Sequence, residues 1–457
     1  MEAINRILGI MTPVTVLLAG LFFALLLRGL PTVRAKHCIR SMTRSKTGAS
    51  SFKSLTLALA GTLGVGNIVG VSSAIALGGF GSIFWMWVSA VAAMFLKYAE
   101  VTLSMRYRET LADGSHRGGA PYYIKARLSR RLPPRVAVLL AIIFALFCIA
   151  NSVLMGCVIQ SNTAASAARE TFGIPPVATG LALALLCFLC SRGGRRAVTA
   201  VTSFLVPLMS GLFLLVSLAA LIRQSAAIPR AFRLIFETAF RADSAAGGIF
   251  GFLLSRGIRF GTIRGLISNE AGCGTSPTAH AASESDSPVE QGFFGIVEVL
   301  VDTLLLCTVT ALVIILRFEE VSTLSASPIS MTLAAYAAPF GSAGGLIRSL
   351  LAAAVLCFGF ATMLCWEHYG SESLSFILRT IRKKDGKATP EGLPSLLFLI
   401  VFCLFALWGS RAAPALVWSM TDLITGMMTL MNTGILLLSH KEIRNVTLSY
   451  FQIRIIN

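Results

Sequence analysis

The amino-acid sequence predicts an all-α polytopic membrane protein, and three observations lead to that fold class. Of the 457 residues, 55% are hydrophobic and only 13% are charged, and the mean hydropathy is +0.77. A soluble globular domain carries roughly 25% charged residues, and a disordered chain combines low hydrophobicity with high charge, so both classes are excluded. The apolar residues also form continuous runs, unlike the alternating pattern of a transmembrane β-barrel.

Eleven apolar runs are long enough for membrane-spanning helices, which need about 20 predominantly apolar residues. They cover residues 9–28, 52–77, 82–106, 136–160, 177–192, 197–223, 246–285, 287–316, 345–378, 393–410 and 412–439. No small-residue cleavage site follows the first run, so we expect a retained helix and not a removed signal peptide. The seventh run is long and interrupted.

The charges of the connecting segments predict the orientation of the chain. Basic residues gather in segments 28–53, 106–135, 192–196 and 379–384. Because cytoplasmic loops are enriched in Lys and Arg, we expect these segments inside, with the N-terminus outside and the C-terminus cytoplasmic. Segment 223–245 is predicted to be external although it holds four arginines, since long or amphipathic external segments weigh less in this rule. The net charge of +18 is therefore assigned to topology in a bacterial-type inner membrane, with the lipid bilayer as partner and no nucleic acid.

Composition gives little support to an enzyme or a metalloprotein. The ten cysteines lie almost wholly inside apolar runs, where a free thiol behaves as a small hydrophobe. Cys187 and Cys190 match C-x-x-C without a second pair, and His280 and His368 are single imidazoles. No Ser–His, Cys–His or paired-aspartate combination occurs at a common depth. We therefore expect no enzyme activity and no transition metal.

Two of the predicted spans are interrupted by glycine and polar residues. The segment Ala60–Gly70 contains four glycines and Asn67 at mid-membrane. Either Gly66 and Gly70 allow close helix packing, or the helix is broken and offers backbone groups to a ligand. The segment Arg256–Thr275 is also punctuated by glycine. There we expect Arg264 and Glu270 to form a structural ion pair and residues 265–269 to form a ligand wall.

The positions of the two interruptions predict the class of protein. Without the first helix ten spans remain, and the interrupted ones open the first and the second group of five. Interruptions at equivalent places in two halves indicate an inverted-repeat secondary transporter with a site at the midplane. We expect residues 1–50 to form an extra helix and a basic loop, 51–240 and 241–440 to form the two repeats, and 441–457 to form a cytoplasmic tail.

Several motifs carry a resemblance to a known family. They are Ala60-Gly61-Thr62-Leu63-Gly64-Val65-Gly66-Asn67-Ile68-Val69-Gly70, Lys97-Tyr98-Ala99-Glu100, Gly118-Gly119-Ala120-Pro121-Tyr122-Tyr123-Ile124, Ser268-Asn269-Glu270-Ala271-Gly272-Cys273-Gly274 and Pro288-Val289-Glu290-Gln291-Gly292. At these residues the sequence resembles the alanine or glycine:cation symporters, which are sodium-coupled amino-acid carriers. The resemblance implies a leucine-transporter-type fold of five plus five helices with one extra N-terminal helix.

The resemblance also implies a site for a small neutral amino acid and co-transported Na⁺. The implied substrate-binding residues are Gly64, Gly66, Asn67, Gln160, Ile267, Ser268, Asn269, Thr362 and Trp366. The carbonyls of Ala60 and Leu63 and the hydroxyl of Thr362 are the implied sodium ligands. The chain departs from the family pattern at Ala361, where a second threonine is usual, and at Ile267, where an aromatic residue is usual.

Two alternative functions and the role of Asp302 are also considered. Glu367 offers a protonatable group and keeps a proton-coupled amino-acid transporter as an alternative. A non-transporting sensor or scaffold on the same fold is another alternative, supported by the departures at Ala361 and Ile267. For Asp302, a hydrogen bond in helix packing is favoured over a proton relay.

Overall fold

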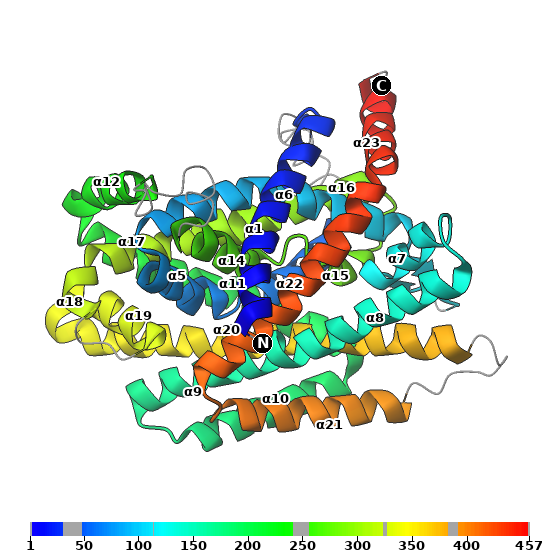
Figure 1. The fold of residues 1–457 in the computed structure, drawn as a ribbon. Coiled ribbons are helices and arrows are strands. Elements are labelled where there is room, and N and C mark those ends of the chain that lie inside the picture. Colours follow the sequence, from blue (N-terminus) through cyan, green and yellow to red (C-terminus); the bar gives the residue numbers. More distant parts are fainter. Residues whose placement is uncertain are drawn as a thin grey trace.

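The computed structural model describes residues 2–30, 48–112, 114–240, 256–322, 327–382 and 392–455, and these form an almost wholly helical molecule (Figure 1). The α-helices are α1 (Glu2–Leu26), α4 (Gly48–Thr62), α5 (Val71–Gly78), α6 (Gly81–Arg106), α7 (Ala120–Leu128), α8 (Pro134–Val153), α9 (Ile159–Phe172), α10 (Pro176–Arg192), α11 (Gly194–Ile222), α12 (Ile228–Ala239), α14 (Arg256–Asn269), α15 (Pro277–Ala281), α16 (Pro288–Val299), α17 (Thr308–Leu316), α18 (Phe318–Ser322), α19 (Pro328–Ala337), α20 (Gly344–Arg382), α21 (Gly392–Gly409), α22 (Pro414–Leu438) and α23 (His440–Ile455).

Shorter elements connect or interrupt these helices. Three are π-helical, η1 (Gly66–Gly70), η2 (Leu154–Val158) and η4 (Leu300–Cys307), and two are 3₁₀-helical, η3 (Ser225–Ala227) and η5 (Ala338–Ala343). The strands β1 (Glu109–Thr110) and β2 (His116–Arg117) pair antiparallel between α6 and α7. Each π-helix lies within a predicted span, so three spans change their helical pitch inside the protein.

The predicted membrane spans are confirmed in outline. Eight helices of the described residues are long and apolar enough to cross a membrane, and α4 with η1 and α5 forms a ninth span that is bent by 50°. The shorter apolar helix α10 and the pair α14–α15 account for the remaining two predicted spans. Residues 241–255, which include the start of the predicted seventh span, lie outside the described part of the chain.

One span is longer than predicted. The helix expected to end at residue 160 continues through η2 and α9 to Phe172. Hydropathy fails there because α9 carries polar side chains, among them Ser161, Asn162 and Thr163, that are buried against protein. Asn162 donates hydrogen bonds to the carbonyls of Gly409 and Ala412, both at 2.8 Å. The polarity of this segment reflects contact with other helices.

The helices pack in an arrangement that places the broken spans inside (Figure 1). In that view α8, α20, α10 and α21 run side by side along the lower part, and α6 and α16 run together above them. The extra helix α1 packs on α6 and α22, and α23 continues upward from the end of α22. The interrupted helices α4–α5 and α14–α15 are buried between these groups.

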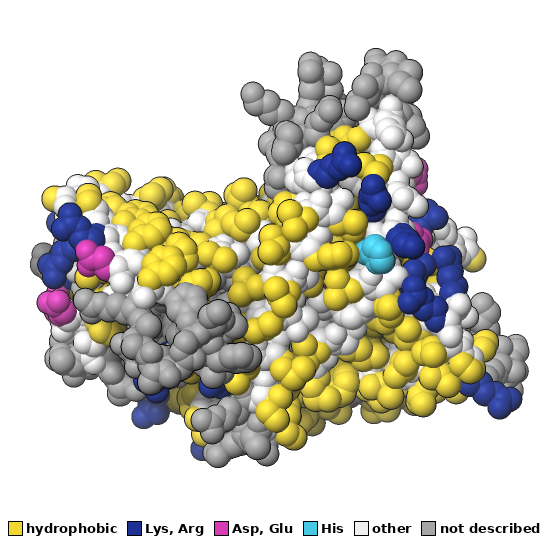
Figure 2. Space-filling model, turned by 45° about the horizontal axis from the view of Figure 1, so that its top comes forward, with side chains coloured by type: hydrophobic (Ala, Val, Ile, Leu, Met, Phe, Trp, Pro, Cys, Tyr) yellow, Lys and Arg dark blue, Asp and Glu magenta, His cyan; other side chains and the backbone are white. Residues whose placement is uncertain are grey.

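The surface agrees with a chain embedded in lipid. On α10, Leu181, Leu185 and Leu189 are all more than half exposed. On α11, Phe204 and Leu215 are exposed to a still greater fraction. Figure 2 shows hydrophobic side chains over most of one face, with Lys and Arg gathered near its ends. Such a surface suits lipid tails. Which end faces the cytoplasm, and where the two repeats begin and end, stay predictions.

Candidate functional site

The first broken helix leaves two backbone carbonyls without their usual partners. In an α-helix each carbonyl accepts from the N–H four residues later. Here the N–H of Gly64 donates to Thr62 at 2.8 Å and the N–H of Val65 donates to Oε1 of Gln160 at 3.1 Å. The carbonyls of Ala60 and Gly61 are therefore free of helical partners, as the glycines of this segment predict.

Helix α20 supplies the missing partners. The hydroxyl of Thr362 donates to the Ala60 carbonyl at 2.9 Å, and the indole N–H of Trp366 donates to the Gly61 carbonyl at 3.2 Å. Thr362 and Trp366 are one turn apart and both are buried. The structure thus brings together three groups that the sequence places far apart: the α4 end, Gln160 on α9 and the middle of α20.

Glycine is required at two places around this junction. A Cβ on Gly64 would lie 2.9 Å from Oγ1 of Thr362 and 3.1 Å from Oε1 of Gln160. A Cβ on Gly156, in η2, would lie 2.0 Å from Cβ of Trp366. The first glycine leaves room between two polar side chains, and the second lets α20 approach η2 closely.

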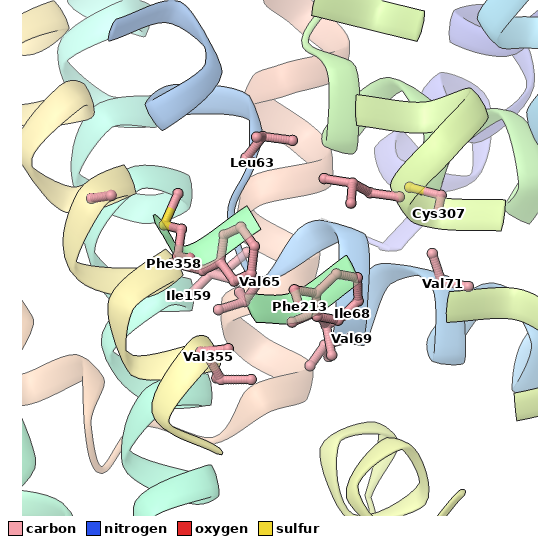
Figure 3. Packing of buried hydrophobic residues seen from close by; sticks show 14 of the residues in the cluster. Leu63, Val65, Ile68, Val69, Val71, Ile159, Phe213, Cys307, Val355 and Phe358 are labelled. Carbon is pink, nitrogen blue, oxygen red and sulfur yellow. The ribbon is translucent and has the colours of Figure 1, made fainter. Parts of the chain in front are cut away.

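An apolar layer closes one side of the junction (Figure 3). Val65 lies near Phe358 and Ile159, and Ile68 lies near Phe213. Val65 belongs to the break itself, and the other side chains come from η1, α9, α11 and α20. They exclude water from the backbone groups of the break, which strengthens electrostatic interactions there.

The second broken helix meets the first at Asp302. The side-chain amide of Asn67 donates to Oδ1 of Asp302 at 2.6 Å, and the hydroxyl of Ser268 donates to Oδ2 at 2.6 Å. Thr303 also donates to Oδ2, at 2.7 Å, and Asn269 donates to Oγ1 of Thr303 at 3.1 Å. All five residues are buried. Asp302, on η4, therefore links η1 to the end of α14.

Two predicted wall residues approach each other through backbone. A Cβ on Gly66 would lie 3.6 Å from Cα of Ser268 and 3.9 Å from the carbonyl oxygen of Ile267. Ile267 is buried and also lines a cavity on the other side of α14, facing α1 and α22. The predicted substrate residues thus lie at two adjoining places along the first break. One holds Gly64, Gln160, Thr362 and Trp366. The other holds Gly66, Asn67, Ile267, Ser268 and Asn269.

Asp302 has the role that the sequence favours, a hydrogen bond in helix packing, and it makes more such bonds than expected. Its carboxylate accepts from three side chains, one on each broken helix and one on η4. The available signal was the pair Asp302-Thr303 inside an otherwise apolar run. A buried carboxylate in a membrane span is costly unless hydrogen-bonded, so these three donors stabilise Asp302 at this position.

The expected ion pair between Arg264 and Glu270 is wrong. Arg264 instead pairs with Asp422 on α22 at 3.0 Å and lies over the ring of Trp418, 4.4 Å from its centre. Glu270 accepts from the hydroxyl of Thr275 at 2.5 Å. Arg264 is on a helix and Glu270 follows its end with a φ of 54°, so the chain turns and carries the two side chains apart.

A buried charged cluster lies beside this turn. Lys97 pairs with Glu298 at 3.3 Å and donates to Ser276 at 2.6 Å, and Nε2 of His280 lies 3.0 Å from the second oxygen of Glu298. Glu100 accepts from Asn432 at 2.7 Å. Oε2 of Glu100 and Oε1 of Glu270 are buried without a hydrogen-bond partner.

The sequence and the fold can now be compared with known proteins. The family model described as the sodium:alanine symporter family matches residues 1–455. The chain belongs to the sodium:alanine symporter family. It is therefore a multi-pass membrane transporter and not an enzyme, as the sequence predicts.

Relatives of this symporter family extend over most of the chain. The sodium/alanine symporter AgcS of Methanococcus maripaludis is 35% identical over 401 residues, covering 86% of this chain and 83% of its own. The putative sodium/proton-dependent alanine carrier protein YrbD of Bacillus subtilis is 32% identical, covering 92% and 86%. The probable sodium/glutamine symporter GlnT of the same organism is 32% identical, covering 90% and 82%.

Solved structures show the fold. A Na⁺-coupled sialic acid symporter in a substrate-bound outward-open state superposes with a TM-score of 0.58 at 15% identity, covering 94% of this chain and 85% of its own. MhsT in complex with L-phenylalanine gives a TM-score of 0.50 at 13% identity, covering 87% and 99%. The expected leucine-transporter-type fold is confirmed.

Proposed function

We propose that this member of the family is a sodium-coupled symporter that imports small neutral amino acids, alanine and glycine, by alternating access. The observation that carries the proposal is the junction of the first broken helix with α20, where the Ala60 and Gly61 carbonyls meet Thr362 and Trp366. Neutral oxygens and an indole at a helix break form a site for a small cation and an amino acid.

The proposed sodium ligands are the carbonyls of Ala60 and Leu63 and the hydroxyl of Thr362. Hard cations prefer oxygen ligands. The Thr362 hydroxyl donates to the Ala60 carbonyl at 2.9 Å. A hydroxyl has two acceptor lone pairs and its hydrogen rotates, so the same oxygen can turn to a cation. Binding of Na⁺ would then replace the hydrogen bond between Thr362 and Ala60 by contacts of both oxygens with the ion.

The proposed substrate pocket is lined by Gly64, Gly66, Gln160 and Trp366, with Asn67, Ile267, Ser268, Asn269 and Thr362 around it. The amide groups at the start of a half-helix favour a carboxylate, and η1 begins at Gly66. A Cβ on Gly64 would lie 2.9 Å from Oγ1 of Thr362 and 3.1 Å from Oε1 of Gln160, so the wall at this glycine is narrow. A narrow site favours a small side chain over a long one.

Sodium can drive this uptake. Moving one charge down 100 mV supplies roughly 2.3 kcal/mol. We propose that the chain lies in the plasma membrane with the N-terminus outside and the C-terminus inside. The two repeats, residues 51–240 and 241–440, would rock against each other around the site, with the extra helix on the outside of the bundle.

A substrate panel tests the proposal. Purified chain in liposomes is given an inward Na⁺ gradient and radiolabelled L-alanine, D-alanine, glycine, serine or glutamine, with Na⁺ replaced by Li⁺ or choline in parallel. We expect Na⁺-dependent uptake of alanine and glycine that exceeds glutamine uptake. Preference for glutamine, or equal uptake in choline, would reject the substrate or the cation.

Proton coupling is the second candidate, and the partnerless oxygen of Glu270 favours it. Glu367, the group that suggested this alternative, accepts a hydrogen bond from Ser371 at 3.1 Å. It lines a cavity of about 430 Å³ together with Arg195 and Glu372, and it lies on a different face of α20 from Thr362. Uptake driven by an inward proton gradient in choline, and lost in Glu270→Gln, would support this candidate. Amino-acid binding without uptake under either gradient would indicate a sensor or scaffold.

A further inference from the structure

A small cavity with a largely apolar wall lies between α1, α14 and α22. It has a volume of about 50 Å³, and Asn5, Thr12, Arg259 and Asp422 contribute polar side chains to its wall. Oδ1 of Asn5, Oγ1 of Thr12 and Nε of Arg259 are all buried without a hydrogen-bond partner. Buried polar atoms are normally paired, so these three atoms leave unused hydrogen-bonding capacity beside the cavity.

Arg259 is the charged group that this cavity leaves uncompensated. The neighbouring carboxylate of Asp422 pairs with Arg264 at 3.0 Å. Arg259 has a ring contact, with its guanidinium 5.4 Å from the centre of Phe260, but no ion pair among the described residues. Among the side chains that the structure describes, two guanidinium groups facing one carboxylate leave a net charge of +1, which calls for an anion.

Helix α1 is shaped to hold Arg259 in place. A Cβ on Gly9 would lie 2.7 Å from Nε of Arg259, so only the missing side chain of this residue admits the guanidinium. The amide of Asn5 donates to the carbonyl and hydroxyl of Ser419, at 2.9 and 2.7 Å, which fixes α1 along α22. The extra helix thus completes the cavity wall.

The depth of Arg259 identifies the source of the anion. Ten residues separate Arg259 from Asn269, where α14 ends at the break, and at 1.5 Å per residue this is about 15 Å. A break at the midplane and a hydrocarbon core about 30 Å thick put Arg259 at the level of the lipid headgroups. Arg264 lies deeper, and the protein itself neutralises it.

We propose that this cavity binds the headgroup phosphate of an anionic phospholipid from the leaflet on the side of the N-terminus. The guanidinium of Arg259 donates to the phosphate, and the hydroxyl of Thr12 donates a second hydrogen bond. The exposed apolar side chains of α1 beside it, Ile4, Ile7 and Met11, offer contact to the acyl chains. The lipid would join α1 to α14, the helix that ends at Ser268 and Asn269, independently of which solute is transported.

The test uses the full chain purified in detergent. Native mass spectrometry and thermal unfolding are recorded with added dioleoylphosphatidylglycerol or dioleoylphosphatidylcholine. We expect one phosphatidylglycerol to stay bound when phosphatidylcholine dissociates, and the melting temperature to rise with phosphatidylglycerol alone. Arg259→Gln should weaken phosphatidylglycerol binding about tenfold, as expected for loss of a charge-assisted contact. Arg411→Gln, in an exposed turn before α22, should leave it unchanged.

The outcomes decide between three cases. Equal retention of the two lipids by the unmodified chain would overturn the proposal without any variant. Equal phosphatidylglycerol binding by Arg259→Gln and Arg411→Gln would overturn the site. A melting shift with sodium phosphate that matches the shift with lipid would indicate a free anion and overturn the lipid assignment. Arg259→Lys keeps the charge and should retain the preference for phosphatidylglycerol, which protects the test against a misfolded glutamine variant.

Discussion

At the scale of single residues, Thr362 carries the sodium part of the proposed function. Thr362→Ala removes the hydroxyl that lies 2.9 Å from the Ala60 carbonyl. We expect the Na⁺ concentration for half-maximal uptake to rise about tenfold, which corresponds to roughly 1.4 kcal/mol. Uptake measured over a series of Na⁺ concentrations checks this.

A threonine-to-alanine effect needs a control on the same helix. Ser373 is also buried on α20, and its hydroxyl donates to the carbonyl of Tyr369 in its own helix at 2.9 Å. Ser373→Ala should leave the Na⁺ dependence unchanged. An unchanged Na⁺ dependence in Thr362→Ala would reject the ligand role of this hydroxyl.

We expect transport and stability to be sensitive to substitution of Asp302, although the residue stands alone in an apolar run of the sequence. Asp302→Asn replaces one acceptor oxygen by a donor facing Asn67, Ser268 and Thr303, which all donate to this carboxylate. A buried donor left unpaired costs about 1–3 kcal/mol, so the melting temperature should fall and uptake should be lost. Asp286→Asn, at an exposed carboxylate, is the control. Full uptake by Asp302→Asn would contradict the linking role.

The residues predicted from sequence differ in a physical way from those that were missed. The glycine-rich break was predicted from its own residues, whereas its partners Gln160, Thr362 and Trp366 were implied by the family resemblance, and the structure brings them together with the break. The partner of Arg264 depends on how α22 packs against α14, which no local pattern encodes. Local chemistry predicted the breaks, and tertiary packing decided the ion pairs.

At the scale of elements, the contact between η2 and α20 should be intolerant of added volume. Gly156→Ala would place a Cβ 2.0 Å from Cβ of Trp366, a contact with a rigid part of the chain. Overpacking costs about 1–3 kcal/mol, and Trp366 must move away from the Gly61 carbonyl. We expect a lower melting temperature and weaker alanine binding. Gly434→Ala, which would meet nothing within 4 Å, should preserve both.

Helix α23 is held to the bundle by Glu442. Its carboxylate accepts from Arg106 at 2.6 Å, from Tyr107 at 2.8 Å and from Arg127 at 2.8 Å. Burial by itself raises the pKa of Glu442, but the hydrogen bonds from Arg106 and Tyr107 and the charge of Arg127 outweigh it and leave the pKa below its usual 4.5.

This lowered pKa predicts how the attachment of α23 depends on pH. A carboxylate with a lowered pKa stabilises the folded state fully above pH 4.5, and this stabilisation is lost as the pH falls through its folded-state pKa. Limited proteolysis should therefore release α23 increasingly as the pH falls below 4.5, and at pH 7 in Glu442→Gln. In the control variant Glu237→Gln, on α12, α23 should resist proteolysis at pH 7 as it does in the unmodified chain. Equal resistance of Glu442→Gln at pH 7 would contradict the attachment.

The elements themselves were mostly visible in the sequence. Composition predicted the spans, and glycine clusters predicted interruptions within Ala60–Gly70 and Arg256–Thr275. The structure places the breaks at residues 63–65 and 270–276. The π-helices η2 and η4 were not predicted, because one widened turn leaves no mark in apolar composition. The extension through α9 was missed because its polar side chains face other helices.

At the scale of the whole molecule, the two broken helices meet at one place and the rest of the bundle surrounds it. Asn67 from the first and Ser268 from the second both donate to Asp302. A ligand that orders one break would therefore act on both broken helices, which is the coupling that the proposed alternating access requires.

The most direct test of sodium-coupled transport is concentrative alanine uptake by liposomes with a potassium diffusion potential, negative inside, in Na⁺ or in choline. With equal Na⁺ on both sides, we expect the potential alone to drive alanine above its external concentration, and Thr362→Ala to lower this accumulation at limiting Na⁺. No accumulation in Na⁺, or the same accumulation in choline, would contradict sodium coupling.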